Sequence, residues 1–197
     1  MKVLFTTNLP SPYRVEFFSE LGRLCDLTVV YERHSASDRD SSWSVKAEKT
    51  YKEVFLKGKS IGTDNSFCPG VLSMLNKNYD VIVIGVYSTF TSMIAIAYMR
   101  LRGMRFLIST DGGFVKEESA SKFRLKKFLI SGAFAWLSTG KKTDEYLVHY
   151  GAKRERIYTY PFTSLSERDI LNSPLSYDEK IDLRSHLKIL TGGGYNA

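Results

Sequence analysis

The chain has 197 residues, of which 43% are hydrophobic and 25% charged, and this composition excludes intrinsic disorder, coiled coil and low-complexity structure for the whole. Lysine and arginine outnumber aspartate and glutamate by 28 to 21, so the formal net charge of +7 favours phosphorylated molecules, anionic lipid or nucleic acid as partners. Only Cys25 and Cys68 occur and no metal-ligand spacing is evident, so we expect neither a disulfide framework nor a bound metal.

Short apolar runs alternate along the chain with amphipathic segments of helical length. This alternation, with strands that are mostly continuous apolar runs, predicts an α/β fold with a Rossmann-like, doubly wound parallel sheet. Ligands of such sheets bind at the carboxyl ends of the strands. The predicted strands are residues 3–6, 27–31, 54–56, 81–84, 106–109, 133–137 and 157–160. The predicted helices are residues 12–23, 70–76, 91–102, 121–131 and 142–150.

The loop after the first strand, residues 8–14, has neither a glycine-rich dinucleotide fingerprint nor a Walker A motif. NAD-dependent enzymes and P-loop NTPases are therefore disfavoured. Ser11 and Pro12 predict the start of a helix, whose backbone N–H groups could bind a phosphate together with Arg14. The alternative is a proline-stiffened turn with a solvated arginine.

A long polar stretch at residues 33–50 contains Trp43 among serines and charged residues. Long connections of this kind often carry function. Trp43 is a candidate to stack on a sugar ring, and an indole packed against its own domain is the alternative.

Residues 81–99 carry no charge over 19 positions, close to the roughly 20 that a membrane-spanning helix requires. The β-branched run at 81–84 and the polar turn at 88–92 instead predict a buried strand followed by a buried helix. The N-terminus lacks the long apolar core of a secretory signal, so we expect a cytoplasmic protein.

Asp111, Gly112 and Gly113 follow the predicted strand at 106–109 and form the most specific local motif of the chain. Two glycines allow the backbone to turn sharply and to approach a ligand closely. A carboxylate at this place could orient or deprotonate a hydroxyl group. The alternative is an Asx turn, in which Asp111 bonds its own backbone.

The predicted helix over 121–131 interleaves bases with large apolar side chains. Phe123 and Ile130 share one face, and Lys126 and Lys127 flank it, as in a helix that lies on an anionic membrane surface. A basic solvated face with two incidental apolar residues is the alternative. Because no helix-turn-helix, RRM or KH signature accompanies the bases, we expect no nucleic-acid partner. The opposite face, expected to pack on the sheet, consists of Leu125, Phe128 and Leu129.

The regular alternation ends near residue 165. We expect residues 1–165 to form one Rossmann-like domain and residues 166–197 to form a linker and a helix leading to a second domain. Ser176 and Glu179 have the spacing of a capping box, which opens a helix through residue 187.

Segments 2–14, 108–114 and 137–141 resemble the N-terminal half of bacterial GT-B glycosyltransferases, and in particular the retaining family-four enzymes of capsule and lipopolysaccharide synthesis. Residues 179–184 are similar to the helix that leads into the second domain of those enzymes. The resemblance implies that the first domain binds the acceptor and that the second binds most of the nucleotide-sugar.

Two features depart from this family. The glutamate pair of the family's second domain, separated by seven residues, has no counterpart here, and proline and serine replace the glycine pair after the first strand. We therefore expect residues 1–197 to be inactive by themselves and to need a C-terminal donor domain, in cis or in trans.

The function implied is that of a hexosyltransferase, as part of a longer or split enzyme, which transfers a sugar to a lipid-linked or polysaccharide acceptor at the inner face of the cell membrane. The nucleotide-sugar donor is a substrate, and no cofactor is expected. Asp111 occupies the position at which relatives place a catalytic or acceptor-positioning residue. The alternative function is a non-catalytic membrane-surface subunit that recruits a separate catalytic partner. Candidate acceptor- and phosphate-binding residues are Arg14, Ser11, Gly112, Gly113 and Trp43.

Overall fold

The structure, a computed structural model, describes residues 1–34, 49–62, 65–75, 78–160, 170–171 and 173–186. Its contacts divide the chain into two units, Met1–Ser164 and Leu165–Ala197, next to the boundary expected at residue 165. Trp43 lies outside the described residues.

The first unit is built on a seven-stranded sheet with the strand order β3-β2-β1-β6-β7-β8-β9. Every neighbouring pair in this sheet is parallel. The predicted α/β class with a Rossmann-like parallel sheet is thereby confirmed. The strands are β1 (Lys2–Thr7), β2 (Asp26–Tyr31), β3 (Lys52–Phe55), β6 (Val81–Ile84), β7 (Leu107–Thr110), β8 (Ala135–Ser138) and β9 (Ile157–Thr159).

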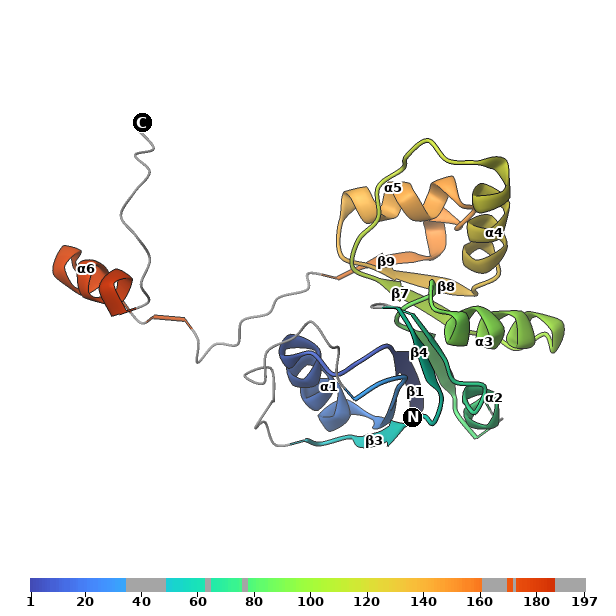
Figure 1. Cartoon of the computed structure of the whole chain (residues 1–197), viewed down its shortest axis with the longest axis horizontal. Coiled ribbons are helices and arrows are strands. Elements are labelled where there is room, and N and C mark those ends of the chain that lie inside the picture. Colours follow the sequence, from blue (N-terminus) through green and yellow to red (C-terminus); the bar gives the residue numbers. More distant parts are fainter. Residues whose placement is uncertain (35–48, 63–64, 76–77, 161–169, 172, 187–197) are drawn as a thin grey trace. The chain divides into compact units, whose positions relative to one another are not determined.

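Helices cover both faces of this sheet (Figure 1). One face packs against α1, and the other packs against α3, α4 and α5. The helices are α1 (Pro12–Leu24), α2 (Val71–Met74), α3 (Phe90–Leu101), α4 (Ala120–Ser131) and α5 (Lys141–His149), and a short 3-10 turn spans Arg154–Arg156.

The central strand β1 shows why its sequence is a continuous apolar run. Leu4 belongs to the core on the α3 side, whereas Val3 and Phe5 belong to the core on the α1 side. The rings of Phe5 and Phe18 meet edge to face, with their centroids 4.8 Å apart. A strand covered on both faces has no solvent side, so its sequence does not alternate between apolar and polar residues.

A short antiparallel hairpin between β3 and α2 was not among the predicted elements. It consists of β4 (Lys59–Ile61) and β5 (Asn65–Phe67). Strands of three residues with polar members give no usable periodicity in the sequence. The hairpin depends on tertiary contacts, among them hydrogen bonds to the start of α3.

No helix in the described part of the chain is both long and apolar enough to cross a membrane. The uncharged stretch at 81–99 forms β6 and most of α3, in which Ala95, Ile96 and Met99 are buried. The prediction of a buried strand followed by a buried helix is confirmed.

The second unit contains α6 (Tyr177–His186). The Ser176 amide donates to Glu179 Oε2 at 2.7 Å, and the Glu179 amide donates to Ser176 Oγ at 3.3 Å. This reciprocal pair is the predicted capping box, which satisfies two backbone donors at the start of the helix.

Candidate functional site

Arg14 and Asp111 form an ion pair at the carboxyl edge of the sheet. Arg14 lies in the first turn of α1, directly after β1, and Asp111 follows β7. Because β6 separates these strands, the two loops flank the same point of the sheet edge. Arg14 Nη2 donates to Asp111 Oδ2 at 2.8 Å, and the side chains are 6% and 47% exposed, respectively. The structure therefore brings together two residues that the sequence predicted separately.

The start of α1 holds Arg14 in place. Pro12 occupies the first turn, and the carbonyl of Ser11 accepts from the amides of Arg14 and Val15, each at 2.9 Å. Ser11 is buried, and its hydroxyl makes no capping bond. The burial of Arg14 contradicts the alternative of a solvated arginine, and its phosphate contact stays a prediction.

Asp111 does not form the Asx turn that was its alternative interpretation. Among the described residues its carboxylate bonds Arg14, which lies 97 positions away, rather than its own loop. The turn is instead supported by Thr110 Oγ1, which donates to the carbonyl of Gly112 at 3.0 Å. The half-exposed carboxylate thus has one oxygen held by a buried cation and keeps surface for a ligand.

The backbone conformation and packing at position 113 require a glycine. Its φ is 137°, and a Cβ at this position would lie 2.7 Å from the Tyr146 ring. We expect Gly113→Ala to lower the free energy of unfolding by about 2–4 kcal/mol, through backbone strain and overpacking. Gly112→Ala is the matched control, because a Cβ on Gly112 would meet nothing within 4 Å. Urea unfolding followed by tryptophan fluorescence measures both, and equal losses would contradict this role of Gly113.

A tyrosine-rich cluster supports the connection from β7 to α4. The hydroxyls of Tyr87 and Tyr146 are hydrogen-bonded, and burial raises the pKa of the Tyr87 phenol. Glu118 accepts from Tyr150 at 2.5 Å and pairs with Lys126 at 2.7 Å. The hydrogen bonds from Lys126 and Tyr150 lower the pKa of the Glu118 carboxyl. The connection is therefore fixed near both of its ends.

The prediction that the side of α4 with Phe123 and Ile130 faces a membrane is wrong, because its apolar residues pack against the protein. Ile130 is completely buried in the core, and Phe123 packs against the rings of His149 and Tyr150. Lys126 is engaged by Glu118, and Lys127 is exposed, with its Nζ 5.9 Å from the centre of the Phe123 ring. Positions 123, 126 and 130 form an i, i+3, i+7 stripe, so this stripe is the face that packs inward.

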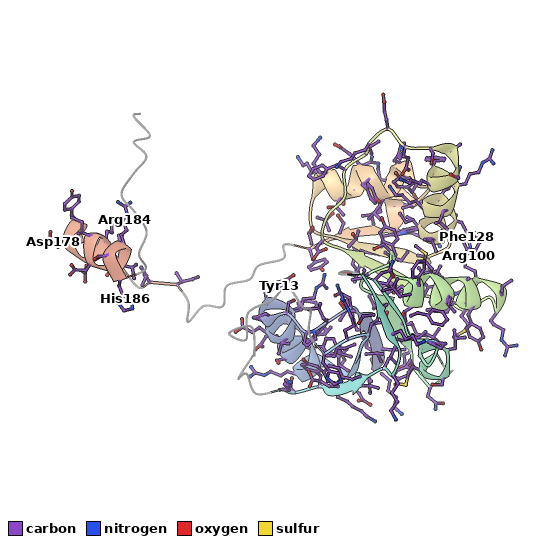
Figure 2. All side chains as sticks on the ribbon, viewed as in Figure 1. Tyr13, Arg100, Phe128, Asp178, Arg184 and His186 are labelled. Carbon is purple, nitrogen blue, oxygen red and sulfur yellow. The ribbon has the colours of Figure 1, made fainter. Side chains whose placement is uncertain are left out.

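The face of α4 that was expected to cover the sheet is largely outside. Leu125 and Phe128 are 47% and 43% exposed, and of the three expected residues only Leu129 is buried. The guanidinium of Arg100 lies over the Phe128 ring, 4.3 Å from its centre, and also donates to the Phe128 carbonyl (Figure 2). This cation partly covers a ring that the core leaves exposed.

Glu32, a residue that the sequence analysis missed, is buried just after β2 at the same edge of the sheet. Its Oε1 accepts from Thr89 Oγ1 at 2.7 Å and from Ser92 Oγ at 3.2 Å, while Oε2 accepts from Ser66. Burial raises the pKa of the Glu32 carboxyl, although these hydrogen bonds oppose the shift. Ser66 belongs to β5, so the carboxylate ties the β4–β5 hairpin to the start of α3. The sequence signal that could have identified Glu32 is an acidic residue directly after a predicted buried strand.

Comparison of this chain with protein-family models gives no match, and comparison with curated proteins gives none either. Within the described residues, no group of three or more histidine, cysteine, aspartate or glutamate side chains could hold a metal ion.

Proposed function

We propose that this chain is the acceptor-binding part of a GT-B glycosyltransferase. It would bind a lipid-linked or polysaccharide acceptor while a donor domain, in cis or in trans, supplies the nucleotide-sugar. The observation that carries the proposal is the half-exposed Asp111 carboxylate, held by buried Arg14 at the carboxyl edge of a parallel sheet. This edge is where α/β proteins bind their ligands.

The ion pair of Arg14 and Asp111 is suited to positioning a hydroxyl group. An ionised carboxylate offers two acceptor oxygens, and the bond from Arg14 to Oδ2 fixes the plane of the group. An acceptor hydroxyl that donates to this carboxylate would be held in one orientation as it meets the donor sugar. Such positioning of a reacting group is a substantial source of catalysis.

The neighbouring glycines suit close approach of a sugar. Gly112 is exposed, with open space where a Cβ would stand, so a ligand can approach its backbone. Gly113 packs against Tyr146 and fixes the turn. We expect the reaction at the cytoplasmic face of the cell membrane, where nucleotide-sugars and lipid-linked acceptors are both present.

Acceptor binding can be tested with the chain alone. We expect a panel of farnesyl-diphosphate-linked hexoses and methyl glycosides to include members that shift the Gly112 and Gly113 amide resonances saturably. Uridine diphosphate glucose, the donor-type probe, should leave them nearly unchanged. Asp111→Asn should weaken the response to the acceptor analogues. A panel that moves neither glycine, or a donor nucleotide that moves both, would contradict the acceptor assignment.

A further inference from the structure

The connection between β7 and α4 exposes two consecutive large apolar side chains. Phe114 is 67% exposed and Val115 is 50% exposed, and together they are called here the apolar apex. Figure 1 shows the connection arching outward between the end of β7 and the start of α4. The apex follows Asp111 and Gly112 within four positions, so it belongs to the same edge of the sheet.

The connection is anchored on both sides of the apex. On one side Gly113 packs against the Tyr146 ring. On the other side Glu118 is bonded by Lys126 and Tyr150, and Ser119 caps α4. The apex therefore lies between two anchored points of the connection.

The chain from the apex through most of α4 is basic in sequence. Between positions 114 and 127, Glu117 is the exposed acidic residue, because the neighbouring Glu118 is neutralised by Lys126. An apolar tip among exposed bases has the composition of a membrane-surface contact, in which apolar groups enter the interface and bases meet lipid phosphates. The exposed bases of this segment are Lys116, Lys122, Arg124 and Lys127.

We propose that the apolar apex inserts into the surface of an anionic membrane and that the surrounding bases pair with its lipid headgroups. Two side chains flanked by like charges are too small an apolar area for a stable protein interface, which buries about 800 Å² on each partner. A lipid surface needs no matching shape. This inference deepens the proposed function by placing Asp111 beside the membrane, but it is tested without any sugar donor or acceptor, so each proposal can fail alone.

The test is co-sedimentation of the chain with vesicles of phosphatidylglycerol and phosphatidylcholine in equal parts, beside vesicles of phosphatidylcholine alone. We expect salt-sensitive binding to the anionic vesicles only. The double variant Phe114→Ser with Val115→Ser should partition at least about tenfold less strongly. The matched control, Leu24→Ser with Leu101→Ser, removes two exposed apolar side chains at the ends of α1 and α3, on the amino edge of the sheet, and should bind like the wild type.

A second variant reports insertion directly. When the anionic vesicles are added, the tryptophan emission of Phe114→Trp should shift to shorter wavelength by more than that of the wild type. Brominated lipid should quench this emission. The proposal would be overturned if the apex variant and the control bound equally, or if Phe114→Trp showed no blue shift. It would also be overturned if Phe114→Ser with Val115→Ser abolished self-association of the chain in the absence of lipid. Thermal unfolding of each variant ensures that folded proteins are compared.

Discussion

With the donor domain present, Asp111→Asn is expected to lower turnover by roughly 100-fold or more, as for a group that orients or deprotonates a reacting hydroxyl. Asparagine preserves the size of the side chain and an oxygen that can accept from Arg14. It removes the negative charge and the ability to accept a proton. The loss should therefore appear mainly in kcat, in addition to the weaker acceptor binding expected of this variant.

The ion pair determines the expected effect of Asp111→Asn on stability. Arg14 is buried, so a neutral partner leaves its charge less well compensated. Because Asp111 is half exposed, solvent screens much of the interaction, and we expect a loss of only about 1–2 kcal/mol. Turnover must be compared at a temperature at which both proteins are fully folded, as verified by urea unfolding.

Asp80→Asn provides a matched control. Asp80 is also exposed and also accepts a hydrogen bond, from the Lys2 amide at 2.7 Å, but it precedes β6 and so lies at the amino edge of the sheet. Its substitution should leave turnover unchanged. Wild-type turnover in Asp111→Asn would reject a catalytic role and leave the loop as a shape-determining turn.

The pairing of Arg14 with Asp111 shows how far local sequence signals reach. Each residue follows a strand that its apolar run identifies, and a parallel sheet puts all such positions on one edge. The strand order decides which of these positions are neighbours. That order depends on contacts between distant parts of the chain, so the two residues could be predicted separately while their ion pair could not.

Helix α4 shows a different limit. Both of its faces carry large apolar residues, and both carry bases, so the sequence leaves its rotation about its axis nearly undetermined. The packing of Phe123 on Tyr150 and the pairing of Lys126 with Glu118 select the rotation. These partners lie outside the helix, and no periodicity within residues 121–131 could have identified them.

Glu32→Ala is expected to lower the free energy of unfolding by about 3 kcal/mol at neutral pH. Three hydroxyls, those of Ser66, Thr89 and Ser92, would lose their acceptor in a buried site, and the removed side chain would leave a cavity. The β4–β5 hairpin should then loosen from α3, which is measurable as faster hydrogen exchange at the Ser66 and Cys68 amides. Unchanged exchange at both amides would contradict the role of Glu32 as the tie.

The pH dependence of Glu32→Gln separates the charge of this group from its shape. Burial raises the pKa of the carboxyl in the folded state above the unfolded value of about 4.3, so the folded state binds this proton more tightly. The contribution of Glu32 to stability is then greatest below pH ~4.3 and falls as the pH rises through the folded-state pKa. Glutamine keeps an acceptor and does not titrate. As the pH rises from mildly acidic to mildly alkaline, the free energy of unfolding of Glu32→Gln, measured in urea, should therefore increase relative to that of the wild type. The opposite trend would mean that the three hydroxyls stabilise the carboxylate more than burial disfavours it.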